Sequence, residues 1–375
     1  MRIGMDLTSL TEHHSGGKEK FIQWLLHGWR DHGWDDELTL FVYPYRAQQV
    51  QGWAPNARVV VVPERHIKFR AQIFRTLELP EMCRREALDF LYFPHPETGL
   101  RKFSIPSAVT PHDIQFIEYP ERQNWYGRWK TKLLYGVDFW LRDGIAAISD
   151  YDYNAMANHY PRHAGKVKRI YNPVVISERI PETTAVPSAI MTVNIGFAHK
   201  NVETIVKAYE RIHQQISHQL VLVGPIRPET RYVEELVNKS PAVDRIQLTG
   251  YVSEKELEDL YDNCAVFVTA STYEGFGMTT AEAMGRGIPV VCSRAAALPE
   301  TTFHSACYYE PADDADSLAE KLLQVIHSPP EKSYLSALKK RVKETYDYQI
   351  IAARYRNWFL DLYNTWTCKN QDNHD

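Results

Sequence analysis

Short apolar runs alternate with longer polar segments of helix length along almost the whole chain, and this alternation restricts the folds that the chain can adopt. Runs in the first half include RIGMDL, ELTLFVY, ARVVVVP and DFLYFP, and runs in the second half include IMTVNIG, LVLVG, AVFVTA and IPVVCS. Strand-length runs that alternate with helical segments are typical of a parallel sheet wrapped by helices. The sequence therefore predicts an α/β fold built from repeated strand–helix units.

The alternation pauses at RIYNPVVISERIPETTAVPSA, a segment that holds three prolines. Because a chain of 375 residues is long enough for two domains, we place a domain boundary there, near residues 171–188. We expect an N-terminal domain over residues 1–170 and a second domain over residues 171–345. A helix over residues 346–375 would pack back on the first domain or cap the second. Ligands of such sheets bind outside the carboxyl ends of the strands, so we expect a binding cleft between the two domains.

Composition argues against several classes of function. The formal net charge of -4 gives no support for nucleic-acid binding. The five cysteines are scattered and form no Cys-x-x-Cys pair, so neither a disulfide framework nor a zinc cluster is indicated. No run approaches the roughly 18 apolar residues of a membrane-spanning helix, and MRIGMDLTSL lacks the pattern of a signal peptide. We therefore expect a cytoplasmic protein.

The segment TYEGFGMTTAEAMGRGIPVV carries the strongest chemical signal. AVFVTAS before it is typical of a buried strand and TTAEAMGRG of a short helix, so Glu274–Met278 should form the turn between them. Gly275 and Gly277 allow close backbone approach, and amides at a helix N-terminus suit a diphosphate. Glu274 and Glu282 could both face one ligand. The alternative interpretation is that Glu274 is a solvated loop charge and that Glu282 only complements the helix dipole.

A second turn of the same kind lies in IGFAHKN, which follows another predicted strand and opens a helix near Val202. Lys200 in this turn is well placed to neutralise a bound phosphate. An ordinary surface lysine is the alternative interpretation.

These segments resemble the retaining GT-B glycosyltransferases usually called family four, or group 1, which include bacterial mannosyltransferases. The resemblance extends over nearly the whole chain. It implies two Rossmann-like, doubly wound domains that face each other across a cleft, and sugar transfer with retention, without a cofactor or a required metal. It also implies that Glu274 contacts the donor sugar and Glu282 the nucleotide ribose. The amides that would hold the diphosphate and sugar belong to Gly275, Phe276, Gly277, Met278 and Thr279.

The lysine-containing loop departs from the family pattern. Gly196 and Lys200 match it, and we include His199 among the donor-binding residues. Many relatives carry arginine directly after the glycine, where this chain has Phe197, and relatives often have arginine where His199 stands. The sequence therefore does not identify the second contact to the donor phosphates.

Two segments of the first half also resemble family motifs. TEHHSGGKEKFIQWLL matches a glycine-containing loop at Gly16 and Gly17, which would approach the donor phosphate or the acceptor. A plain turn before an amphipathic helix is the alternative. SAVTPHDIQFIEYPE matches a His-Asp motif at the end of a strand. The resemblance implies that His112 lies near the donor sugar, as a catalytic residue, and that Asp113 lies on the acceptor side.

LTGYVSEKELEDLYDNCAVFV resembles the loop that receives the nucleotide base in relatives. We expect the backbone around Tyr251 and Val252 to contact the base. Ser253 and Glu256 form a capping-box pattern, which is a sufficient role for them. Asp314-Ala-Asp316 could be a metal-binding motif of a different glycosyltransferase fold, but its position before an amphipathic helix favours helix capping.

The resemblance implies a hexosyltransferase that moves a hexose or deoxyhexose, with mannose as the best match, from a GDP-, UDP- or dTDP-sugar. The acceptor would be a glycan or lipid-linked glycan in bacterial O-antigen or exopolysaccharide synthesis. Two alternatives stay open. One is a non-catalytic sugar-nucleotide-binding protein, and the other is an NAD-dependent enzyme, although no Gly-x-Gly-x-x-Gly follows the first strand.

Residues 122–140, RQNWYGRWKTKLLYGVDFW, mix aromatic side chains with Arg122, Arg128, Lys130 and Lys132. Basic and aromatic side chains favour the surface of an anionic membrane. Our hypothesis is that this segment meets the cytoplasmic face of the inner membrane or a lipid-linked acceptor. An ordinary half-exposed helix is the alternative.

Overall fold

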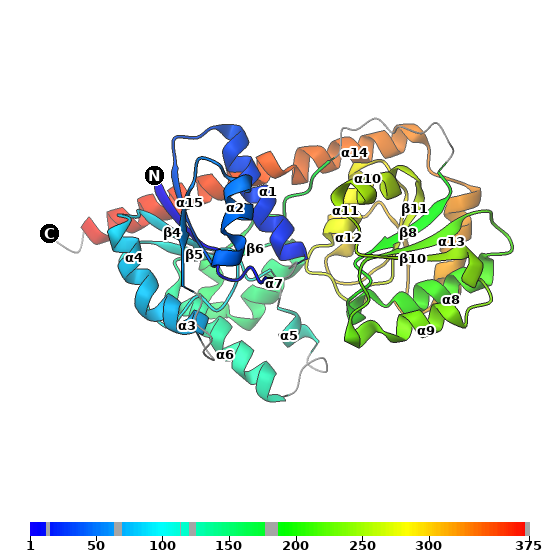
Figure 1. The fold of residues 1–375 in the computed structure, drawn as a ribbon, viewed down its shortest axis with the longest axis horizontal. Coiled ribbons are helices and arrows are strands. Elements are labelled where there is room, and N and C mark those ends of the chain that lie inside the picture. Colours follow the sequence, from blue (N-terminus) through cyan, green and yellow to red (C-terminus); the bar gives the residue numbers. More distant parts are fainter. Residues whose placement is uncertain (13–15, 64–69, 113, 120–124, 177–186, 372–375) are drawn as a thin grey trace. The chain divides into compact units, whose positions relative to one another are not determined.

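The computed structural model describes six segments of the chain: residues 1–12, 16–63, 70–112, 114–119, 125–176 and 187–371. Contacts divide the chain into two compact units, and each unit is a sheet with helices packed on it (Figure 1). Unit 1 comprises Met1–Pro173 and Tyr346–Asp375, and unit 2 comprises Val174–Thr345. Within the described residues, no helix is both long enough and apolar enough to cross a membrane.

The sheet of unit 1 has seven strands in the order β3-β2-β1-β4-β5-β6-β7, and all its pairings are parallel. The strands are β1 (Arg2–Asp6), β2 (Glu37–Val42), β3 (Arg58–Val61), β4 (Phe90–Phe93), β5 (Ser107–Val109), β6 (Gly144–Ala147) and β7 (Val167–Arg169). β4, with the sequence FLYF, is buried along its whole length, as expected for a parallel strand covered on both faces. The strand order reverses between β1 and β4, which creates a topological switch point there.

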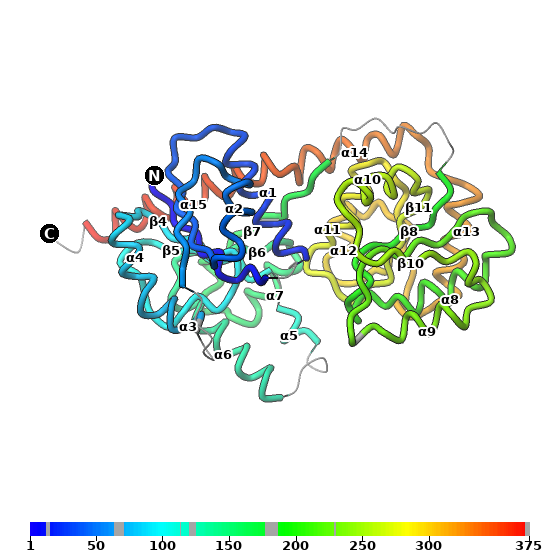
Figure 2. Tube along the Cα trace, in the orientation of Figure 1, coloured from blue at the N-terminus to red at the C-terminus, as the bar shows by residue number. Residues whose placement is uncertain are grey.

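The helices of unit 1 include one from the far end of the chain. They are α1 (Gly17–His32), α2 (Ala47–Trp53), α3 (Arg70–Ile73), α4 (Leu79–Arg85), α5 (Gln115–Glu118), α6 (Trp125–Leu141), α7 (Asp150–His159) and α15 (Tyr348–Gln371). α15 packs against α1, as the red and blue segments of Figure 2 show. Gly28 permits this approach, because a Cβ there would lie 2.3 Å from the Cβ of Ala352. Tyr355 and Phe359 of α15 are part of the core of unit 1.

The sheet of unit 2 has six strands in the order β10-β9-β8-β11-β12-β13, again all parallel. The strands are β8 (Ala189–Val193), β9 (Gln219–Val223), β10 (Ile246–Gly250), β11 (Cys264–Thr269), β12 (Val290–Ser293) and β13 (Cys307–Tyr309). The helices are α8 (Val202–Ile212), α9 (Tyr232–Asn238), α10 (Glu254–Asp262), α11 (Met278–Gly285), α12 (Leu298–Thr301), α13 (Ala315–His327) and α14 (Lys332–Tyr346).

The strand order of unit 2 decides which loops lie together. β8 pairs directly with β11, and the order reverses between them. Because both strands run in the same direction, the loops that follow them leave the same edge of the sheet side by side. Ligands of doubly wound sheets bind at such a switch point. The segments IGFAHKN and TYEGFGM are these two loops.

Candidate functional site

An ion pair joins the two loops at the carboxyl edge of the unit 2 sheet. Nζ of Lys200, in the loop after β8, donates a hydrogen bond of 2.6 Å to Oε1 of Glu274, in the loop after β11. The two side chains are 9% and 13% exposed. Oγ of Ser271 donates a 2.7 Å hydrogen bond to the same oxygen of Glu274. The structure therefore brings together the two charged residues that the sequence singled out, and it adds Ser271, which the sequence did not indicate.

The surroundings of Glu274 favour its ionised form. Burial raises the pKa of the carboxyl, but the charges of Lys200 and His199 and hydrogen bonds from Lys200 and Ser271 outweigh it, so the pKa lies below its ordinary value. The amide of Thr272 donates a hydrogen bond of 2.8 Å to the carbonyl of His199, which ties the two loops together. A carboxylate and an ammonium held in this way could turn to the hydroxyl and phosphate groups of a ligand.

The turn before α11 is shaped for close backbone approach. Gly277 is the N-cap of α11 and has a φ of 93°, which favours glycine. A Cβ there would lie 2.8 Å from Cδ2 of Leu298. The hydroxyl of Thr301 donates a hydrogen bond to the carbonyl of Phe276 and holds the turn. The first amides of α11 have no helical partner one turn earlier, so this end of the helix suits a negatively charged group.

The five residues assigned to the diphosphate and sugar lie together on this turn and its helix. Gly275, Phe276 and Gly277 precede α11, and Met278 and Thr279 are its first two residues. Met278 was predicted to belong to the turn, and that boundary was wrong by one residue. The positive φ of Gly277 already reverses the chain, so the helical conformation begins at the next residue.

Glu282 lies on α11 and is 5% exposed. The hydroxyl of Tyr261 donates a 3.2 Å hydrogen bond to its Oε2. The Arg286 guanidinium lies 4.2 Å from the centre of the Tyr261 ring and pairs with Glu258. Tyr261 of α10 and Arg286, the C-cap of α11, lie within quoted segments, but their contacts were not identified from the sequence because they depend on how α10 packs against α11. They fix the orientation of the carboxylate that the resemblance assigns to the ribose.

Arg227 lies beside the lysine-containing loop, and the sequence analysis did not identify it. Its Cζ is 4.2 Å from the centre of the Phe197 ring, and no described carboxylate pairs with it. A Cβ on Gly196 would lie 3.2 Å from Cγ and Nε of Arg227 and 2.6 Å from the carbonyl oxygen of Pro225. Glycine is therefore required at position 196 for the loop after β9 to reach this place. The sequence signal that could have identified Arg227 was its position shortly after β9, the strand next to β8.

The expected base-binding loop follows β10. The amide of Gly224 donates a 3.1 Å hydrogen bond to the carbonyl of Gly250, which fixes the end of that strand. Tyr251, the next residue, is 70% exposed, and Val252 is partly exposed. Ser253 and Glu256 form the predicted capping box of α10. The structure thus places Tyr251 and Val252 at the same edge of the sheet as Lys200.

His112 follows β5 in unit 1 and has a backbone φ of 71°, an unusual value for a residue with a side chain. Its Nε2 donates a 2.9 Å hydrogen bond to the carbonyl of Pro94, and its ring meets Phe21 edge to face at 4.7 Å. Burial, together with the charge of Lys18, lowers the pKa of His112 to about 3, so the imidazole is neutral at pH 7. Asp113, its predicted acceptor-side neighbour, lies outside the described residues.

We expect His112 to weaken the folded state at acid pH. Its imidazole takes up a proton near pH 6.5 when unfolded but only near pH 3 when folded. Between these values the unfolded chain binds more protons, so the free energy of unfolding should fall as the pH falls, by up to ~1.4 kcal/mol per pH unit. His112→Gln cannot titrate, so the free energy of unfolding, measured by urea denaturation, should fall less steeply with falling pH in this variant. If the unfolding free energy of His112→Gln depended on pH as strongly as that of the wild type, His112 would not be the cause of the pH dependence.

The switch point of unit 1 is occupied by a buried polar cluster that the sequence analysis missed. Nε of Arg75 donates a 2.7 Å hydrogen bond to Oδ2 of Asp6, at the end of β1, and its Nη2 donates one of 3.1 Å to Oγ1 of Thr8. Burial raises the pKa of Asp6, but Arg75 and His95 outweigh it and hold the pKa well below its ordinary value. Arg75 lies far from β1 in sequence, so no local pattern links the two. The cluster fixes the start of the loop after β1, at Thr8.

Gly16 and Gly17 lie at the start of α1. Gly16 is the N-cap, with a φ of 65°, and no atom of the described residues, which exclude 13–15, lies within 4 Å of where its Cβ would be. α1 begins at Gly17, and the amide of Lys20 bonds to the carbonyl of Gly16. The positive φ explains the glycine at position 16.

Asp314 caps α13, as the sequence analysis favoured. Its Oδ1 accepts hydrogen bonds from the amides of Asp316 and Ser317, at 2.9 and 3.0 Å. Asp316 pairs with Arg211. Across the described part of the chain, no group of three or more His, Cys, Asp and Glu side chains is arranged to hold a metal ion.

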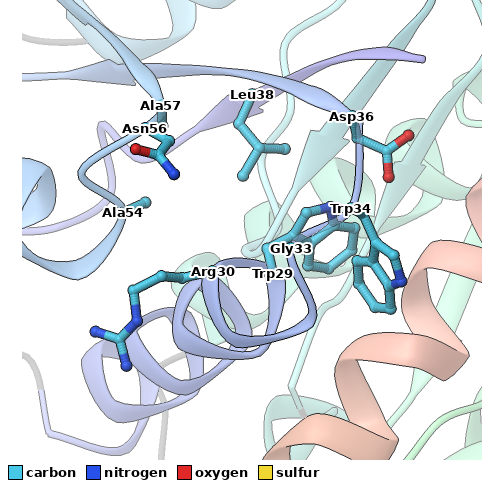
Figure 3. Close-up of a pocket in the computed structure, with 9 residues that line it drawn as sticks. All are labelled: Trp29, Arg30, Gly33, Trp34, Asp36, Leu38, Ala54, Asn56 and Ala57. Atoms are coloured by element: carbon cyan, nitrogen blue, oxygen red, sulfur yellow. The ribbon is translucent and has the colours of Figure 1, made fainter.

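A small pocket in unit 1 lies between α1 and the start of β2, next to Trp29, Trp34 and Asp36 (Figure 3). Trp34 stacks on His32 at 4.3 Å, and Asp36 accepts a 3.3 Å hydrogen bond from the amino group of Met1. The pocket adjoins the amino end of β2. The candidate residues follow the carboxyl ends of strands, so we assign this pocket no part in the site.

The two strand orders and the helices around them define a GT-B fold, as predicted, and solved structures of this fold match nearly the whole chain. Sucrose-phosphate synthase from Thermosynechococcus elongatus matches with a TM-score of 0.78 and 19% identity, over 97% of this chain and 99% of that one. Anabaena HepE in complex with UDP-glucose matches with a TM-score of 0.76 and 16% identity, over 96% of this chain and 100% of that one.

Residues 184–344, which lie in unit 2, match the family glycosyl transferases group 1. O-antigen chain mannosyltransferase B of Escherichia coli is 33% identical over 127 residues, which are 33% of each chain. MMP alpha-(1->4)-mannosyltransferase of Mycolicibacterium hassiacum is 31% identical over 159 residues, 41% of this chain and 38% of that protein. The chain thus spans only about a third of the length of these relatives. These matches support the predicted resemblance at the level of group 1, over unit 2.

Proposed function

We propose that the chain is a glycosyltransferase that moves a hexose or deoxyhexose from a nucleotide-sugar to an acceptor with retention of configuration. The observation that carries this proposal is the Lys200–Glu274 ion pair at the switch point of a group 1 domain, beside the N-terminus of α11. The similarity to proteins named as O-antigen chain mannosyltransferases supports a mannose-type sugar. GDP-, UDP- and dTDP-sugars are the candidate donors.

In the proposed complex, the diphosphate lies against Lys200 and the first amides of α11. Glu282, held by Tyr261, accepts hydrogen bonds from the ribose, and the backbone at Tyr251 and Val252 contacts the base. Without donor, the charge of Lys200 is balanced by Glu274. A bound phosphate would compete for the ammonium, and the oxygen of Glu274 would become available to sugar hydroxyls.

The proposed reaction breaks the bond between the anomeric carbon and the diphosphate oxygen and forms a bond to an acceptor hydroxyl on the same face. The proton of that hydroxyl passes to the departing diphosphate. Negative charge grows on the leaving group as its bond breaks, so Lys200 and the α11 amides would stabilise the transition state more than the ground state. None of these steps requires a metal or a cofactor.

Arg227 is our candidate for the second cationic contact to the diphosphate, in place of the arginine that the sequence lacks at positions 197 and 199. Arg227 lies in the loop after β9, which is the strand next to β8, and its guanidinium lies on the ring of Phe197. Guanidinium groups bind phosphate through paired hydrogen bonds, and an aromatic ring holds such a group in place without neutralising it.

Replacing Arg227 by glutamine should raise the donor KM by roughly 10- to 100-fold and change kcat less, because a charge-assisted hydrogen bond to phosphate contributes roughly 1.5–3 kcal/mol. Binding of the nucleoside diphosphate should weaken by a similar factor, while binding of the free nucleoside should stay unchanged in calorimetry. Arg211→Gln, which breaks an exposed pair with Asp316, is the matched control. Equal effects of the two substitutions would remove Arg227 from the donor site.

On the acceptor side, we propose that unit 1 binds a glycan or lipid-linked glycan used for bacterial surface polysaccharide, at the cytoplasmic face of the inner membrane. Neutral His112 would contribute an uncharged imidazole near the donor sugar, and the backbone at Gly16 would let the acceptor or donor phosphate approach. This part of the proposal rests on the family resemblance and on the placement of these residues after strands and before α1.

A thermal-shift screen against GDP-, UDP- and dTDP-hexoses tests the donor site. One donor should raise the melting temperature, and EDTA should leave that shift unchanged. NAD and NADH should have no effect. Stabilisation by NADH but by no nucleotide-sugar would favour the oxidoreductase alternative. A donor that binds but releases no nucleoside diphosphate with a range of acceptors would favour the non-catalytic binding protein.

A further inference from the structure

Helix α6 carries a stripe of large apolar side chains that the fold leaves in solvent. Trp125, Trp129, Leu133 and Trp140 are 81%, 61%, 52% and 70% exposed. The spacing of the first three residues, four apart, places them on one face of a helix, and Trp140 returns to that face two turns later. We call these four residues the α6 stripe.

The α6 stripe belongs to a helix whose position is fixed by the rest of unit 1. Tyr135, Phe139 and Leu141 on other sides of α6 are buried, and Tyr135 and Phe139 pack into the unit 1 core. The stripe residues Trp129, Leu133 and Trp140 line a shallow apolar groove together with Tyr160. Figure 1 shows α6 at an outer edge of unit 1, with one end extending away from the strands. α6 is therefore anchored in unit 1 through its C-terminal half, which carries Trp140.

Basic side chains border the α6 stripe on both sides. At about 100° per residue, Arg128 and Lys132 flank it on one side and Lys130 on the other. The one acidic residue of α6 is Asp138, which is 2% exposed and accepts hydrogen bonds from Glu97 and Thr98. The solvent side of α6 therefore combines tryptophan and leucine with positive charge and exposes no carboxylate of its own.

The C-terminal end of α6 extends this positive character. Nζ of Lys166 donates hydrogen bonds to the carbonyls of Phe139, Trp140 and Arg142, at 3.1, 3.0 and 2.8 Å. It thus satisfies backbone carbonyls at and just beyond the C-terminal end of α6. A cation at this end also complements the helix dipole.

We propose that the α6 stripe, with Arg128, Lys130 and Lys132, binds the surface of an anionic lipid bilayer. Tryptophan prefers the boundary between headgroups and acyl chains, and lysine and arginine that border an apolar stripe are attracted to anionic headgroups. A protein partner or a second copy would have to supply an acidic rim around an apolar groove, whereas an anionic bilayer presents both features at every point of its surface. α6 would lie in the interface, with its buried side still packed in unit 1.

The α6 proposal does not depend on the proposed transferase activity. Vesicle binding needs neither donor nor acceptor, and nucleoside diphosphate release from a soluble donor needs no vesicle. Each can therefore be measured while the other is absent, and the failure of one would leave the other standing.

The test is flotation of the full chain with vesicles of phosphatidylcholine alone or mixed with phosphatidylglycerol. The chain should float with the anionic vesicles, float much less with the neutral ones, and lose binding at high salt. Trp129→Ser/Leu133→Ser should reduce the partition coefficient on anionic vesicles about tenfold or more, and so should Lys130→Glu/Lys132→Glu. Lys340→Glu, a charge reversal at an exposed lysine of α14, should bind as the wild type does.

Circular dichroism and the melting temperature should show that all these variants are folded, because the substituted side chains are exposed. The proposal would be overturned if the wild-type protein bound neutral and anionic vesicles equally. It would also be overturned if the α6 variants bound anionic vesicles as the wild type does. A wild-type dimer that becomes monomeric in Trp129→Ser/Leu133→Ser without any vesicle binding would overturn it as well, since a second copy would then cover the stripe.

Discussion

Glu274→Gln should lower kcat about 10²-fold or more, because the proposed role of this carboxylate is to orient the reacting sugar. The substitution keeps the shape of the side chain and removes its charge. It also leaves Lys200 without the carboxylate that now lies 2.6 Å from its Nζ. Release of nucleoside diphosphate at saturating donor is the quantity to measure.

The matched control for Glu274→Gln is Glu235→Gln, which removes an exposed carboxylate that pairs with Lys239 in the same unit. This variant should keep wild-type turnover. Glu274→Gln with near-normal kcat and an intact melting profile would remove Glu274 from the reaction.

Lys200→Met should have the second large effect, a loss of about 10²–10³-fold in kcat, because charge that develops on the leaving diphosphate would lose its nearest ammonium. Stability should fall as well, by roughly 2–3 kcal/mol, since Glu274 would keep a poorly solvated charge. This value lies below the range for fully buried pairs because both side chains retain some exposure. Lys207→Met, in an exposed pair with Glu203, is the control and should change neither quantity.

The double variant Lys200→Met/Glu274→Gln separates the catalytic role of the pair from its structural role. It removes both charges, so no unpaired ion remains, and its free energy of unfolding should recover most of what Lys200→Met loses. Its kcat should stay as low as that of the worse single variant. Recovery of turnover together with stability would mean that the ion pair only holds the two loops together.

The sequence was sufficient to predict the features of this site that depend on neighbouring residues. The strand, glycine turn and helix around Glu274 follow from hydrophobic pattern and turn chemistry, as does the capping box of Ser253 and Glu256. Lys200 was also found locally, because it lies between a strand and a helix that the pattern already defines. The GT-B fold and the family followed from motif resemblance rather than from these patterns alone.

Apart from Ser271, which lies three residues before Glu274, the missed contacts join segments far apart in the chain. Arg227 reaches Phe197 from the next strand, and Tyr261 reaches Glu282 from the preceding helix. Such contacts depend on strand order and on where helices pack, and neither leaves a periodic signal. Gly196 was assigned to the donor from the family pattern, but its close approach to Pro225 and Arg227 became visible only once both loops were placed.

The most direct test of the proposed transferase activity is release of nucleoside diphosphate by the purified full chain from GDP-, UDP- and dTDP-hexoses, with and without a bacterial lipid extract as acceptor source. We predict release from one donor that is stimulated by the extract, insensitive to EDTA and nearly lost in Glu274→Gln. If wild-type protein and Glu274→Gln release the nucleotide equally from every donor, or if neither releases it, the proposed transferase site in unit 2 is wrong.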